Sequence, residues 1–239
     1  CAAVGVGGSF WLRAVLAAGA IGVLLWAVPV APPVPRATGR LIDVLRDGQL
    51  MRLNFGVFAL HLIQTTMWVM VPSALVASGG LPVPEHWKVY LPAVLLSFVV
   101  MVPAVIVAER HDKLKPVFNA AIVLLAIVQF GLWLFGDGLI PLALLLTLFF
   151  VAFNVLEATQ PSWISRIAPP SSKGTALGVY NTLQSVGLFL GGVLGGRLGQ
   201  AFGPAAVSLF CAVLALVWLA LASSMNPPPL RVAPAAAPR

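Results

Sequence analysis

Seven long apolar runs constrain this chain more than any other feature. Each run approaches or exceeds the roughly 20 helical residues that cross a hydrocarbon core of about 30 Å. A helix satisfies its own backbone in lipid, and the runs lack the alternation of barrel strands. We therefore expect an all-α integral membrane protein with seven transmembrane helices, near residues 10–31, 51–76, 90–108, 116–136, 139–164, 174–197 and 204–224.

The composition also indicates a membrane protein. Only 9% of the residues are charged and 60% are hydrophobic, whereas about 25% are charged in an ordinary soluble domain. The net charge of +7 comes from basic residues that stand singly in loops between the apolar runs. That pattern is typical of membrane topology, so we expect a lipid bilayer around the chain and no nucleic-acid partner.

Little in the chain indicates catalysis. Cys1 and Cys211 have no spacing that would suggest a metal site or a disulfide framework. A membrane-embedded enzyme usually carries clustered His, Asp or Cys, whereas the three histidines here are scattered. We therefore expect no enzyme activity, no metal and no cofactor.

The distribution of Lys and Arg predicts the orientation. Alternate connections hold eleven basic residues on one side and three on the other, which together make the 14 of the chain. The richer side is cytoplasmic by the positive-inside rule, so the first helix enters from outside and the C-terminus lies inside. The richer set comprises Arg36, Arg40, Arg46, Arg52, Arg110, Lys113, Lys115, Arg166, Lys173, Arg231 and Arg239.

Glu157 is the only acid well inside an expected span, where burying a charge costs about 2.5–3.5 kcal/mol. It should therefore face protein or water, and Asn154 and Gln160 should share its helix face. One interpretation is a substrate-site or coupling carboxylate that protonates during transport. The other is a structural carboxylate, hydrogen-bonded near the cytoplasmic end of its helix.

Polar residues recur at helical spacing on two other spans. They indicate faces that line a cavity or contact another helix. His61 could be a proton relay or an ordinary hydrogen-bonded interior histidine. The candidate cavity or coupling residues, with Glu157, are Asn54, His61, Gln64, Trp68, Asn181 and Gln184.

A ridge of small residues marks the sixth span. Small residues four apart let two helix backbones approach closely in lipid. The simplest interpretation is tight helix packing, and the alternative is a smooth surface along which helices slide. The residues are Gly187, Gly191, Gly192, Gly195 and Gly196.

Several stretches resemble the major facilitator superfamily. The run AERHDKLK at 108–115 resembles the second, degenerate copy of its cytoplasmic signature, with Glu109 for the acid and Arg110, Lys113 and Lys115 for the bases. By itself this run could be an ordinary positive-inside turn. The stretches at 52–61, 153–165 and 173–187 resemble helices seven, ten and eleven of the YajR-like branch of drug/proton-antiporter-type members.

The resemblance implies a twelve-helix fold of two halves, of which this chain carries helix six and the C-terminal half. Residues 1–32 would be the last helix of the first half, 33–49 the central cytoplasmic loop, 50–224 a six-helix bundle and 225–239 a disordered cytoplasmic tail. The missing first half would be a partner, and the natural chain would start before Cys1.

The activity implied is alternating-access transport of a small solute across a bacterial inner membrane, as proton-coupled efflux. Protons and the solute would then be ligands. Two alternatives stay open from the sequence: a membrane scaffold or receptor that transports nothing, and an inactive, truncated half-transporter.

Overall fold

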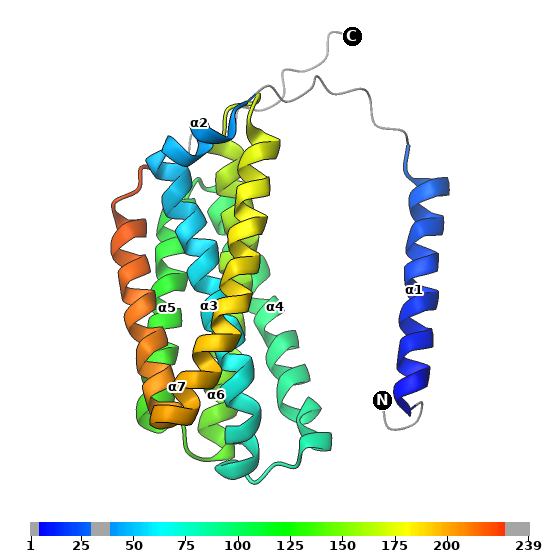
Figure 1. Cartoon of the computed structure of the whole chain (residues 1–239), viewed down its shortest axis with the longest axis vertical. Helices are drawn as coiled ribbons and strands as arrows, with labels where there is room; N and C mark the ends of the chain where they lie inside the picture. Colours follow the sequence, from blue (N-terminus) through cyan, green and yellow to red (C-terminus); the bar gives the residue numbers. More distant parts are fainter. Residues whose placement is uncertain (1–4, 30–38, 228–239) are drawn as a thin grey trace. The chain divides into compact units, whose positions relative to one another are not determined.

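The computed structural model describes residues 5–29 and 39–227, which fall into two units, Cys1–Arg36 and Ala37–Arg239. The first unit contains the helix α1, Gly5–Ala27 (Figure 1). Its apolar side chains, Trp11 and Trp26 among them, are exposed. It is long and apolar enough to cross a membrane. Residues 1–4 and 30–32 of the expected first helix lie outside the described residues.

The second unit is a bundle of long helices. Helix α3 packs against α6 and α7, α4 against α6, and α5 against α6 and α7. The large side chains at its centre, including Phe118, Trp163 and Trp218, are fully buried. The elements are α2 (Leu41–Arg46), α3 (Gly48–Ala77), the 3-10 helix η1 (Val83–Glu85), α4 (Trp87–Arg110), α5 (Leu114–Phe135), α6 (Leu139–Ile167) and α7 (Lys173–Ser223).

The last two expected spans are joined in the single element α7. A straight helix of its 51 residues would be about 77 Å long, more than twice the hydrocarbon core. It bends at Gly203, whose φ of 80° favours glycine, and Pro204 follows. Figure 1 shows the chain reversing there, so α7 supplies two crossings. The expectation of a loop at 198–203 is wrong, because the helix continues to Phe202.

The connector expected at 33–49 is partly helical. It contains α2, and α3 begins at Gly48, earlier than expected. The Asp47 carboxylate caps that start by accepting hydrogen bonds from the backbone N–H groups of Gln49 at 2.8 Å and Leu50 at 3.1 Å. Residues 30–38 of the connector and 228–239 of the expected tail lie outside the described residues.

Helices α3 and α7 approach closely along part of the glycine ridge. A Cβ added at Gly187 would collide with the Phe58 carbonyl oxygen, and one added at Gly191 would collide with that of Leu62. The Thr66 hydroxyl donates a 3.0 Å hydrogen bond to the Gly191 carbonyl across this contact. The backbones of α3 and α7 are therefore in direct contact here, a close approach that small residues permit between helices in lipid.

The other three glycines of the ridge differ in how closely they approach α3. A Cβ at Gly195 would stand 3.0 Å from the Thr66 Cα, which is still tight. At Gly192 it would meet only the Thr65 methyl group at 3.7 Å, and at Gly196 it would meet nothing within 4 Å. The contact therefore follows the four-residue spacing, and Gly192 and Gly196 lie beside it.

A Gly191→Ala substitution should therefore destabilise the bundle, although alanine is the better helix former by about 1 kcal/mol. The new methyl group has to separate two backbones, and overpacking of this kind costs about 1–3 kcal/mol. Thermal unfolding in detergent measures the effect. Gly196→Ala is the matched control, since it makes the same change in open space and should hold or raise the melting temperature. Equal melting temperatures for the two variants would contradict the close contact.

Candidate functional site

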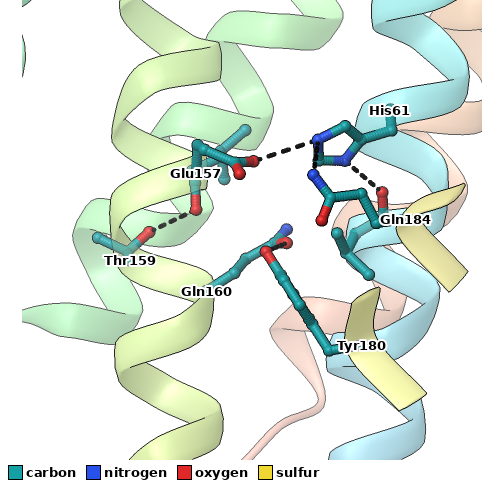
Figure 2. A network of polar contacts seen from close by, with 8 residues as sticks. His61, Glu157, Thr159, Gln160, Tyr180 and Gln184 are labelled. Carbon is teal, nitrogen blue, oxygen red and sulfur yellow. Dashed lines mark hydrogen bonds and ion pairs between the residues drawn. The ribbon is translucent and has the colours of Figure 1, made fainter. Parts of the chain in front are cut away.

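Three polar side chains from three helices meet inside the second unit. His61 of α3 is 3% exposed. Its Nε2 atom lies 2.8 Å from Nε2 of Gln184 on α7 and 3.4 Å from Oε2 of Glu157 on α6. Figure 2 shows the three side chains pointing toward one another. Three of the residues singled out from the sequence thus form one cluster.

The other ring nitrogen of His61 fixes which atom can exchange a proton. Nδ1 lies 2.9 Å from the carbonyl oxygen of Val57, one turn earlier on α3. A carbonyl only accepts, so Nδ1 carries a hydrogen and donates it. The nitrogen that can gain or lose a proton is therefore Nε2, the one that faces Glu157 and Gln184.

Glu157 is only partly enclosed. Its side chain is 37% exposed, while its Oε2 atom is buried and has no hydrogen-bond partner among the described residues. Asn154, expected on the same face, instead donates a 2.7 Å hydrogen bond to Ser97 of α4. The 60° between the two positions is enough to point them at different helices. Glu157 thus faces His61 on one side and open space on the other.

A second pair of polar residues lies directly beneath the cluster. The Tyr180 hydroxyl of α7 donates to Oε1 of Gln160 on α6 at 3.3 Å, and both residues are buried (Figure 2). Sequence reasoning did not assign Tyr180 to the site. The available signal was its position four residues before Gln184, which places both on one face of α7.

The four remaining candidates differ in their surroundings. Asn54 is buried, Gln64 is half-buried and Asn181 is exposed. Trp68 is 46% exposed and stacks on Tyr90 of α4, with ring centroids 5.1 Å apart. The polar residues of α3 therefore have different surroundings along the helix.

Two aromatic side chains lie farther along the same two helices as His61 and Glu157. Phe150 of α6 lies 6.3 Å from Trp68, centroid to centroid. His61 and Trp68 are seven residues apart on α3, as Phe150 and Glu157 are on α6, so each pair shares a helix face. The aromatic rings and the acid are then separated by about 10 Å along the helix axes. The accessible groups along these faces are therefore the Glu157 carboxylate and the ring of Trp68.

The signature-like loop holds the ends of α4 and α6 together. Glu109 accepts from the Arg166 guanidinium and, at 2.6 Å, from the Ser162 hydroxyl. The side chains of Glu109 and Arg166 are 19% and 9% exposed. This ion pair joins residues 57 positions apart. The acid of the loop thus fastens two helices of one bundle.

The basic residues of the loop have separate environments. Lys115 donates to the backbone oxygens of Ser223 and Met225 at 2.9 and 2.6 Å, which caps the end of α7. Arg110 and Lys113 are exposed. Within residues 5–29 and 39–227, no group of three His, Cys, Asp or Glu side chains could hold a metal ion.

Comparisons with known proteins agree with this architecture. The chain is 40% identical over 232 residues to the inner membrane transport protein YajR of Escherichia coli K12, covering 95% of this chain and 51% of YajR. It is 25% identical over 189 residues to the uncharacterized transporter BU466 of Buchnera aphidicola, covering 76% and 48%. It is 24% identical over 163 residues to the multidrug resistance protein MdtH of Aeromonas hydrophila, covering 68% and 39%.

The chain therefore spans about half the length of the curated relatives it matches. Six helices in the described part are long and apolar enough to cross a membrane, and α7 reverses once within its length. The family model described as Major Facilitator Superfamily matches residues 53–239. This chain is a membrane protein that belongs to the major facilitator superfamily of transporters.

Proposed function

We propose that the protein containing this chain moves a small solute out of the cytoplasm in exchange for protons, and that His61 and Glu157 bind the coupled proton. The observation that carries the proposal is the approach of His61 Nε2 to Glu157 Oε2 at 3.4 Å on the partly open side of the bundle. An acid and an imidazole this close need only a small approach to form a hydrogen bond, and ionisable groups inside a membrane span mark proton relays and ion pathways.

The pair offers two places for one proton. Nε2 of His61 can carry it and donate toward Glu157, or the Glu157 carboxyl group can carry it and donate toward Nε2. Gln184 accommodates both states, because its amide can donate to a bare Nε2 or, turned by half a rotation, accept from a protonated one.

Alternating access supplies the rest of the proposed cycle. In this superfamily two halves rock around a midplane site, and the side of Glu157 that is open here would face the other half. Solute and proton would then compete for the carboxylate, so proton entry from outside would release solute there. The exposed ring of Trp68, about 10 Å from the acid along the helix axes, suits a flat, cationic solute.

The proposed location is a bacterial inner membrane with the C-terminus in the cytoplasm. Eleven of the 14 basic residues lie in connections assigned to that side. The loop with Glu109 and the end of α7 would both lie at the cytoplasmic surface. The name of YajR, an inner membrane transport protein, agrees with this location.

Ethidium, a planar aromatic cation, is a suitable first probe. The whole protein is reconstituted into vesicles whose interior is made more acidic than the outside. We expect ethidium to accumulate in these vesicles beyond the level of protein-free vesicles, and a protonophore to abolish the difference. Accumulation that persists after the pH gradient is collapsed would contradict proton coupling.

A further inference from the structure

Buried polar atoms without partners surround one small region of the candidate site. Gln160 is fully buried, and its Nε2 atom has no hydrogen-bond partner among the described residues. The same is true of Oε2 of Glu157, one turn earlier on α6. Buried polar groups are nearly always hydrogen-bonded, so the N–H of Gln160 calls for a partner, and Oε2 of Glu157, which His61 approaches only to 3.4 Å, can accept a further hydrogen bond.

The arrangement suits a single water molecule. Figure 2 shows the Gln160 amide extending from α6 and the Gln184 amide from α7, both beneath the His61–Glu157 contact. The Gln160 N–H donates, while the carboxylate of Glu157 and the Gln184 carbonyl accept. A water molecule can accept from the first and donate to the other two. Three hydrogen bonds are the usual number for a buried water.

The geometry points to a bound water molecule between Glu157, Gln160 and Gln184, held by Gln160 as a positioning residue of the His61–Glu157 site. The Tyr180 hydroxyl fixes Gln160 in turn, because it occupies the Oε1 atom of that amide and leaves the N–H groups to face the water. The titratable groups around this region are His61 of α3, Glu157 of α6 and Tyr180 of α7.

The water would keep the carboxylate solvated on its buried side in both protonation states. Without it, the buried Oε2 atom of Glu157 would depend on His61 alone. The effect of the water on the Glu157 carboxyl group rests on the proposed proton coupling, whereas the presence of the water does not. One measurement therefore tests for the water, and a second tests for protonation of Glu157.

Radiolytic labelling tests for the water directly. X-rays convert a bound water into hydroxyl radicals that oxidise adjacent side chains, even buried ones. The intact protein is irradiated in ¹⁸O-water, and each rate is divided by the rate of the same residue in the unfolded chain. Tyr180, 3% exposed, should be labelled at least about fivefold faster than Phe149, which is 2% exposed. Phe149 packs against the rings of Phe150 and Phe153 and serves as a dry control.

The same measurement on variants assigns the water to Gln160. Gln160→Met should lower the Tyr180 rate to that of Phe149, while Gln129→Met should leave it unchanged, since Gln129 is equally buried but lies on α5. Wild-type labelling of Tyr180 no faster than that of Phe149 would overturn the proposal. So would labelling that Gln160→Met does not reduce. The wild-type comparison holds even if a variant fails to fold.

Infrared spectroscopy then separates the two proposals. The protonated Glu157 carboxyl band should move to higher frequency in Gln160→Met, because a hydrogen bond to the group is lost. If that band is absent from the wild type at every pH, the proton-coupling proposal fails while the labelling result stands. If the band is present and Tyr180 is not labelled, the water proposal alone fails.

Discussion

Replacing Glu157 by glutamine should abolish accumulation of ethidium driven by a pH gradient, with a loss of at least tenfold relative to the wild type. Glutamine has nearly the same shape as a protonated glutamate but cannot release a proton, so the site would stay in one charge state. The gradient would then have no group through which to act. The measurement is the initial rate of ethidium uptake into acid-interior vesicles, corrected for protein-free vesicles.

The control for this variant removes an acid elsewhere. Asp137 lies in the exposed turn between α5 and α6, where it accepts a hydrogen bond from Ser78 at 3.2 Å. Asp137→Asn makes the same change in charge and should keep uptake within about twofold of the wild type, as a surface substitution would. A Glu157→Gln variant that accumulates ethidium with the wild-type pH dependence would remove Glu157 from the coupling role.

Replacing Glu109 by glutamine should cause the largest loss of stability. Arg166 would keep its charge in a position where its side chain is 9% exposed, and it would lose the carboxylate that compensates it. Removing one partner of a buried ion pair costs about 3–5 kcal/mol, because the remaining charge stays desolvated. Some solvent reaches Glu109, at 19% exposure, so we expect the lower end of that range.

An exposed ion pair provides the comparison. Glu85 and Lys88 are 44% and 52% exposed and lie 2.7 Å apart. Exposed pairs contribute about 0–1 kcal/mol, so Glu85→Gln should barely change the melting temperature in detergent. The double variant Glu109→Gln with Arg166→Met should recover part of the loss, since no buried charge is left over. Equal melting temperatures for Glu109→Gln and Glu85→Gln would contradict the account of the loop.

The sequence alone was enough to predict the helical membrane architecture. An unpaired backbone group is costly in lipid, so a long apolar run crosses the membrane as a helix, which pairs its own backbone groups. The ends of the helices were harder. The stretch at 198–203 contains two glycines and is only weakly polar, so it resembled a short loop. Only Gly203 leaves the helical conformation, and the chain reverses at that single residue. Local composition could not distinguish a loop from a helix that ends at Phe202, two residues before a proline.

The candidate site was predictable only as separate residues. His61 and Gln184 lie 123 positions apart, and helical periodicity says which residues share a face but not which helices meet. Asn154 and Glu157 show the same limit, since three positions along α6 were enough to direct one to α4 and the other to α3. The partner of Glu109 could not be predicted, because several basic residues were expected on the same side.

The most direct test of the central claim is an infrared titration of the intact protein. The account predicts a carboxyl C=O band that appears as the pH is lowered, disappears in Glu157→Gln and changes frequency in His61→Gln, where its partner is altered. Asp137→Asn should leave this band in place. Identical low-minus-high pH spectra for the wild type and Glu157→Gln would show that Glu157 does not exchange a proton, and the claim that it binds the coupled proton would be wrong.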